Sequence, residues 1–219
     1  EGKIIQVVDG TWQVRVLGDP KLPDYWEEYL PGKIAEIKAV QDECGHKCFS
    51  FIVMSDLHYP LNISKLTPWI AKRIAEACDI KFIICLGNTQ SKEAYETKEQ
   101  VLEENELVKE MLSPIADRLL RTQGNYDGNY GVLGSSYYVY RIPPQEMFNY
   151  IYRGVGFVGD VHFDKSGNGY YVDDTANNVR YIMLNTQNTP YVLNINDTQK
   201  FSNVDNFRFG QSQYDMVVE

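Results

Sequence analysis

Three short apolar runs in the middle of the chain, each followed by polar residues, predict three buried strands. They span residues 49–54, 80–86 and 117–122. Runs of this length and composition are typical of buried strands and are too short for buried helices. Two longer stretches with helical spacing, 67–77 and 93–112, lie between them. Alternating strands and helices are typical of a parallel sheet with crossover helices, so the pattern predicts an α/β fold.

The predicted helices carry recognisable start and stop signals. Thr67 and Pro68 form an N-cap and first-turn pair for the first crossover helix. Asp24 is placed to cap an earlier helix whose apolar positions extend to Val40. We expect Pro31, which is followed by glycine, to break or kink that helix.

Alternating polar and apolar positions at both ends of the chain predict antiparallel hairpins. Residues 3–8 and 11–17 alternate around Asp9-Gly10, a strong turn signal. Residues 169–173 and 179–185 predict a second hairpin, which we expect to join the sheet. Short helices are predicted at 144–153 and from 211 onward. The chain then divides into an N-terminal hairpin and helix extension, 1–48, and an α/β domain, 49–219.

Length, charge and hydropathy restrict the function. The chain has 219 residues, of which 43% are hydrophobic and 23% charged, as is typical of globular proteins. A net charge of −9 argues against sequence-independent nucleic-acid binding, which depends on Lys and Arg. Because there is no apolar run of about 18 residues and no signal-peptide pattern, we expect a soluble protein without a membrane partner.

The cysteines fall into two groups. Cys78 and Cys85 lie in apolar stretches, and we expect them to be buried thiols. Cys44 and Cys48 flank His46. That cluster is compatible with a metal ion or with a short disulfide, although no second pair of ligands follows it.

Polar residues follow each of the three predicted strands. Asp56 and His58 follow the first, Asn88 the second and Asn125 the third. Because the carboxyl ends of parallel strands meet at one edge of a sheet, we expect these residues to lie together. Carboxylates, amides and imidazoles bind divalent cations. Asp56 and His58 also fit a loop cap and an ordinary polar residue, and Gly-Asn pairs also form simple turns.

The order of these motifs resembles the calcineurin-like metallophosphoesterases from about residue 49 to 219. The resemblance implies hydrolysis of a phosphomonoester or phosphodiester by metal-activated water, with Mn²⁺, Zn²⁺ or Fe. It assigns Asp56 and His58 to the first metal, Asn88 to the bridging position and Asn125 to the second metal. Tyr126 and Asp127 match the catalytic segment, with Tyr126 in place of the histidine that contacts the phosphate.

The chain departs from this family at three places. Asn88 stands where the family has the bridging aspartate, and Tyr126 where it has histidine. A phenol is a poorer general acid near neutrality than an imidazole. The later Gly-His-x-His segment is absent, and His162 is a possible substitute ligand or a surface residue. We therefore expect an incomplete C-terminal part, one metal ion or none, and impaired activity.

Two functions follow from this pattern. One is a metal-dependent phosphoesterase acting on a phosphate ester. The other is an inactive structural or interaction domain of the kind encoded among phage and prophage genes, located in the cytoplasm or on a virion. If the sheet is incomplete, its apolar edge should be covered by a second copy or by a partner chain.

Overall fold

The computed structural model describes residues 2–8, 11–17, 21–45, 48–91, 97–129, 142–143, 146–147, 151, 160–187, 192, 195 and 209–218. For residues 2–8, 11–17 and 62–63 it describes the backbone alone. The predicted turn at Asp9-Gly10 and most of the predicted helix at 144–153 lie outside these ranges.

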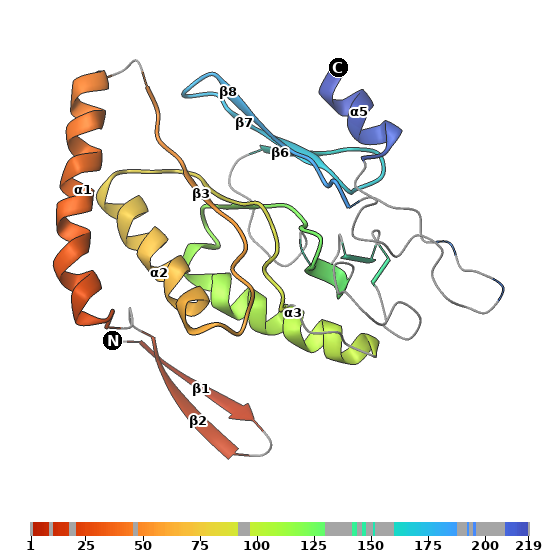
Figure 1. Ribbon diagram of the computed structural model, residues 1–219, viewed down its shortest axis with the longest axis horizontal. Coiled ribbons are helices and arrows are strands. Elements are labelled where there is room, and N and C mark those ends of the chain that lie inside the picture. The colour runs from red at the N-terminus through yellow and green to blue at the C-terminus, as the bar shows by residue number, and fades with distance from the viewer. Residues whose placement is uncertain are drawn as a thin grey trace.

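A three-stranded parallel sheet forms the centre of the molecule (Figure 1). Its strands are β3 (Ile52–Met54), β4 (Ile83–Cys85) and β5 (Leu119–Arg121), in that order. Helix α2 (Asn62–Ala77) connects β3 to β4, and α3 (Lys98–Leu112) lies between β4 and β5. The predicted α/β alternation is confirmed, and each strand is shorter than the apolar run that predicted it.

A separate antiparallel sheet lies beside the parallel one. It consists of β6 (Asp160–Phe163), β7 (Tyr170–Asp174) and β8 (Val179–Met183). The β7–β8 hairpin was correctly predicted, but the expectation that it joins the first sheet is wrong. The two sheets are connected through a side chain instead: the Tyr170 hydroxyl accepts from Arg121 N (2.8 Å) and donates to Arg121 O (2.9 Å). Tyr170 and Val172 of β7 are buried in one core with Ile84 and Leu120 of the parallel sheet.

Two apolar cores lie on opposite faces of the parallel sheet. The first contains Ile83 and Leu119 and packs against α2 and α3. The second contains Ile84 and Leu120 and packs against the antiparallel sheet through Tyr170. Successive residues of a strand point to opposite faces of the sheet, so neighbours such as Ile83 and Ile84 belong to different cores. Helix α1 (Asp24–Cys44), which the sequence assigns to an N-terminal extension, packs its apolar face on the first core.

The helix boundaries correct two predictions. Helix α1 is continuous through Pro31, so the expected break is absent, and Asp24 is its first residue rather than its cap. Helix α2 begins at Asn62, and Pro68 lies inside it. An extra N-terminal turn forms because the buried Ser64 donates to Leu57 O and thereby joins that turn to the loop after β3. In both helices tertiary packing outweighs the hydrogen bond lost at proline.

The remaining predicted elements agree with the structure except at the start of α3, which was predicted at residue 93 and lies at Lys98. Helix α3 begins after Thr97, whose side chain and that of Gln100 form a reciprocal capping box. The N-terminal strands β1 (Gly2–Val8) and β2 (Thr11–Leu17) pair as an antiparallel hairpin. Helix α5 (Gln211–Val218) was also predicted. Short 3-10 turns occupy Ser113–Ile115 and Asp127–Asn129. None of the described helices is both long and apolar enough to cross a membrane.

Strand β3 is less buried than its apolar sequence predicts. It is an end strand of the described parallel sheet, and Val53 is 51% exposed. Phe49 and Phe51, which precede β3 in the predicted strand, are also exposed and stack on each other. An apolar run therefore predicts a strand correctly here without predicting complete burial, because burial depends on what covers the edge.

Candidate functional site

The loops that follow β3 and β4 are joined by backbone hydrogen bonds. Asp56 N donates to Gly87 O, and His58 N donates to Asn88 O, both at 3.0 Å. Asp56, His58 and Asn88 all have positive φ, at 57°, 47° and 51°. Few non-glycine residues adopt this left-handed conformation, and such residues are concentrated at functional sites and tight turns. The predicted cluster therefore forms at the carboxyl edge of the sheet.

Two glycines allow the loops after β4 and β5 to approach each other. A Cβ on Gly87, whose φ is 95°, would lie 2.1 Å from Gly124 N. A Cβ on Gly124 would lie 2.3 Å from both the backbone N and the side-chain oxygen of Asn88. Any larger residue would push the loops apart. Both glycines are thus required for the contact that places Asn88 beside the third loop.

The Asn88 amide is the central group of the site. Its Nδ2 donates to Asp56 Oδ1 (2.8 Å), and its Oδ1 accepts from Tyr126 N (2.9 Å). A backbone N–H can only donate, so the amide oxygen must face Tyr126 and the amide NH₂ must face Asp56. The orientation of this amide is therefore fixed by its neighbours.

His58 is oriented by a backbone carbonyl. Its Nδ1 lies 3.1 Å from Gln90 O, which can only accept, so Nδ1 carries the proton in the neutral ring. Its Nε2 lies 3.6 Å from Asp56 Oδ1. The Tyr126 ring packs edge-on against the imidazole, with centroids 5.2 Å apart. The Nε2 lone pair and the Asp56 carboxylate are consequently adjacent groups that can each bind a metal ion.

Asp127, predicted as a catalytic residue, is completely buried. Its Oδ1 accepts from Thr89 N (2.9 Å), Thr89 Oγ1 (2.8 Å) and Gln90 N (3.0 Å), and its Oδ2 accepts from Gly124 N (2.9 Å). This carboxylate connects the loops after β4 and β5 and gives no surface to a substrate. Its place in the structure is that of a positioning residue.

Two further ligands were predicted, Asn125 and, as a substitute, His162. Asn125 is half-buried in the loop after β5. In the described part of the chain, no hydrogen bond joins its side chain to Asp56, His58 or Asn88. His162 lies on β6, where it is 3.3 Å from Asp160 and stacks on Tyr171. Its described contacts are all within the antiparallel sheet.

Arg121 is a site residue that the sequence analysis missed. It ends β5, is 2% exposed and donates to Thr89 Oγ1, with Asp127 Oδ1 at 4.0 Å. Its Nε and Nη1 have no hydrogen-bond partner in the described part of the protein. A buried guanidinium needs a nearby negative charge, and Asp127 supplies it. The only signal in the sequence is a charged residue at the end of an apolar run.

The cysteines are free thiols. Cys78 and Cys85 are buried, as predicted, and burial raises the pKa of Cys85 to about 11. A hydrogen bond with the Cys44 thiol raises the pKa of the exposed Cys48. His46 lies outside the described residues, so the predicted metal cluster at this place stays a prediction.

The donor chemistry fits one cation better than two. Asp56 and His58 present an oxygen and a nitrogen side by side, as a single ion requires. A bridged pair needs an anionic oxygen between the ions, and the Asn88 NH₂ group points there instead. Within the described residues, no group of three His, Cys, Asp or Glu side chains is placed to hold a metal.

Compared with protein-family models, with curated proteins and with solved structures, this chain matches none of them.

Proposed function

We propose that this protein is a metallophosphoesterase-like domain in which an amide–carboxylate hydrogen bond replaces the paired-metal centre. It acts as a structural or interaction domain rather than as a two-metal hydrolase. The observation that carries this proposal is the Asn88 amide, whose NH₂ group faces Asp56 at 2.8 Å while its oxygen is held by Tyr126 N at 2.9 Å.

The electrostatics of a metal pair support this proposal. Two divalent cations about 4 Å apart repel each other by roughly 17 kcal/mol at an effective dielectric constant of about 20. A bridging carboxylate offsets this repulsion with its negative charge. Asn88 has no charge to offset it, and its NH₂ group donates to Asp56 Oδ1, one of the oxygens that would hold a cation.

Restoring the bridging charge tests the proposal. The Asn88→Asp and Asn88→Asp/Tyr126→His variants are compared with the unchanged protein for Mn²⁺ and Zn²⁺ content and for hydrolysis of bis(p-nitrophenyl) phosphate. Asn178→Asp, at an exposed turn residue with φ of 54°, is the matched control for added charge. We expect higher metal content only in the Asn88 variants. Two tightly bound ions and metal-dependent hydrolysis in the unchanged protein would refute the proposal.

A single-ion phosphoesterase is the second candidate. It is supported by His58, whose Nδ1 proton is held by Gln90 O and whose Nε2 lone pair lies 3.6 Å from Asp56 Oδ1. In this case one Mn²⁺ or Zn²⁺ binds per chain and supports slow phosphodiester hydrolysis. His58→Ala should then abolish both binding and hydrolysis, whereas a pure interaction domain should show neither in the unchanged protein nor in His58→Ala.

The exposed edge of β3 is the surface that we propose for interaction. Val53 on β3 and Phe51 beside it are exposed, and Leu86 after β4 is 50% exposed. β3 and β8 are both end strands of their described sheets, and end strands carry backbone groups able to pair with another chain. A second copy of this protein is the simplest partner. Light scattering across a concentration series should show association in the unchanged protein and its loss in Val53→Lys.

A further inference from the structure

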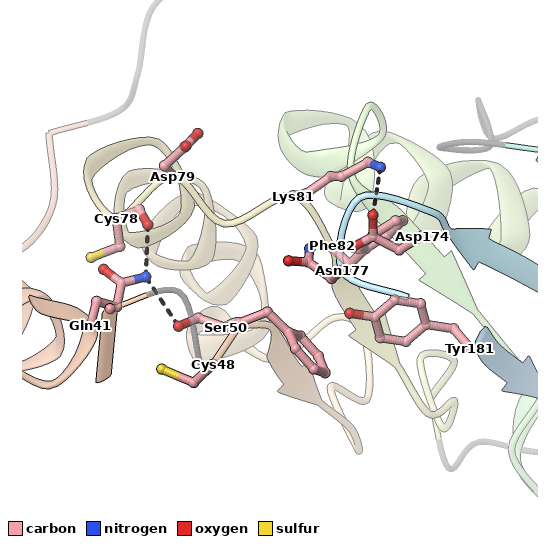
Figure 2. A pocket seen from close by; sticks show the side chains of 12 residues that line it. Gln41, Cys48, Ser50, Cys78, Asp79, Lys81, Phe82, Asp174, Asn177 and Tyr181 are labelled. Atoms are coloured by element: carbon pink, nitrogen blue, oxygen red, sulfur yellow. Dashed lines mark hydrogen bonds and ion pairs between the residues drawn. The ribbon is translucent and has the colours of Figure 1, made fainter. Parts of the chain in front are cut away.

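A pocket lies at the opposite ends of the strands from the Asp56 site (Figure 2). Its volume is about 380 Å³, and this size is within the usual range of small-molecule sites. Its walls come from the C-terminal end of α1, the segments entering β3 and β4, and the β7–β8 hairpin. The residues that line it include Phe49, Ser50, Lys81, Phe82, Asn177 and Tyr181.

The Tyr181 hydroxyl is a buried polar group without a hydrogen-bond partner. Tyr181 is only 7% exposed, and its oxygen has no partner in the described structure. Figure 2 shows this hydroxyl turned toward Ser50, across the pocket. Burial raises the pKa of Tyr181, with a smaller contribution from Asp174, so the phenol keeps its proton as a donor. An unsatisfied buried hydroxyl destabilises the folded protein, and a bound polar atom would recover this energy.

Aromatic rings surround that hydroxyl. The ring of Tyr181 packs against Phe82, with centroids 4.6 Å apart, and against Phe49 and Phe51 at 6.5 and 6.0 Å. Phe49 and Phe82 both line the pocket, and Phe49 is partly exposed. Ring faces and edges of this kind favour a flat aromatic guest, because stacked and edge-on contacts add to the energy of burial.

Two of the three charged residues that line the pocket, Lys81 and Asp174, are paired with each other, and the third, Asp79, is negative. Lys81 Nζ lies 3.3 Å from Asp174 Oδ1, and the other oxygen of Asp174 accepts from Asn177 Nδ2 at 2.6 Å. This arrangement leaves the Asn177 side-chain oxygen as an acceptor, and Figure 2 shows it on the same side as the Tyr181 hydroxyl. Because the Lys81 charge is offset by a buried carboxylate, the pocket provides no net positive charge for an anion.

We infer that this pocket binds a neutral, planar aromatic molecule whose edge carries a hydrogen-bond acceptor and an N–H donor. The acceptor accepts a hydrogen bond from the Tyr181 hydroxyl, the N–H donates to the Asn177 oxygen, and the ring packs among Phe49, Phe82 and Tyr181. Nucleobases and the nicotinamide ring share this chemistry. The inference concerns the amino ends of the strands and does not depend on the function proposed for Asp56 and His58.

Titration of the full chain followed by ¹H–¹⁵N NMR tests this inference. Nicotinamide and adenine are the probes, and nicotinate is the control because it has the shape of nicotinamide with a negative charge. We expect saturable shifts at pocket residues with both neutral probes and at least tenfold weaker binding of nicotinate. The tighter of the two neutral probes identifies the source as a nicotinamide or as a nucleobase.

Two variants separate binding from folding. Tyr181→Phe removes only the hydroxyl, so we expect binding roughly 3- to 10-fold weaker, with a melting temperature equal to or above that of the unchanged protein. Asn177→Ala changes an exposed residue and should weaken binding without unfolding the chain. Absence of saturable shifts, equal affinity for nicotinate, or unchanged binding in Tyr181→Phe would each overturn the inference.

Discussion

Replacement of Asp127 should destabilise the protein more than any exposed acidic residue. The Asp127 side chain is completely buried and accepts four hydrogen bonds, three on Oδ1 and one on Oδ2, at 2.8–3.0 Å. It is also the carboxylate beside Arg121, whose Nη2 lies 4.0 Å away. Two effects therefore combine in any variant: unsatisfied buried donors and an uncompensated buried charge.

The magnitude follows from counting what each variant loses. Asp127→Asn keeps one oxygen but turns an NH₂ group toward Gly124 N and leaves the Arg121 charge without its counter-ion. Each unsatisfied buried donor costs about 1–3 kcal/mol and a broken buried ion pair about 3–5 kcal/mol. One unsatisfied donor and the broken ion pair together give an expected loss of about 4 kcal/mol or more for Asp127→Asn. Asp127→Ala loses every acceptor, and its loss should be larger still.

Urea unfolding followed by circular dichroism measures these losses as shifts in midpoint at constant slope. Asp117→Asn is the matched control, because Asp117 is 74% exposed and its contact with Arg118 is long, at 3.7 Å. That control should change the free energy of unfolding by less than about 0.5 kcal/mol. If Asp127→Asn falls within the same limit, the carboxylate does not hold the two loops together, and our account of the site is wrong.

Three further predictions concern backbone, charge and thiols. Gly87→Ala should lower the free energy of unfolding, measured in urea, by about 3 kcal/mol or more, because φ is 95° and the new Cβ would lie 2.1 Å from a backbone atom. The control Gly32→Ala, in open space on α1, should raise it by about 0.5–1 kcal/mol. Burial opposes ionisation of Asp174, yet its amide and ammonium donors outweigh burial and lower its pKa. Its contribution to stability should be complete above the ordinary aspartate pKa of about 3.9 and should be lost as pH falls through the lower pKa of the folded state. In a pH series, the urea midpoint of Asp174→Asn should therefore fall less steeply at acid pH than that of the unchanged protein. At pH 8 iodoacetamide should alkylate Cys48 in the folded protein, and Cys85, whose pKa is about 11, only after unfolding. Mass spectrometry of the labelled peptides measures the order, and labelling of Cys85 before Cys48 would contradict the prediction.

Local pattern was a good guide to secondary structure but a poor one to helix starts. The apolar runs predicted all three parallel strands, and alternation predicted both hairpins. The start of α2 was placed six residues late, with Thr67 instead of Leu61 as its N-cap. Proline is a strong start signal, and it was outweighed here by a buried contact between Ser64 and the loop after β3. Such contacts join residues from different elements and leave no periodic trace.

The sequence predicted where the candidate site lies better than it predicted the role of each residue in it. Asp56, His58 and Asn88 were expected together because parallel strands place their carboxyl ends at one edge, and hydrogen bonds do join them. Asp127 was predicted as a catalytic residue, and its side chain is completely buried. Arg121 was not predicted at all, since a charge that ends an apolar run gives no sign of which way its side chain turns.

The sequence by itself determined the three parallel strands, the crossover helices, the two hairpins and the three polar segments at one edge of the sheet, because each depends on the spacing of neighbouring residues. The tertiary structure alone decided that β7 and β8 form a second sheet, that the Asn88 NH₂ faces Asp56, and that Tyr181 buries a hydroxyl beside a pocket. These features depend on contacts between residues tens of positions apart, and such contacts are fixed only when the layers pack.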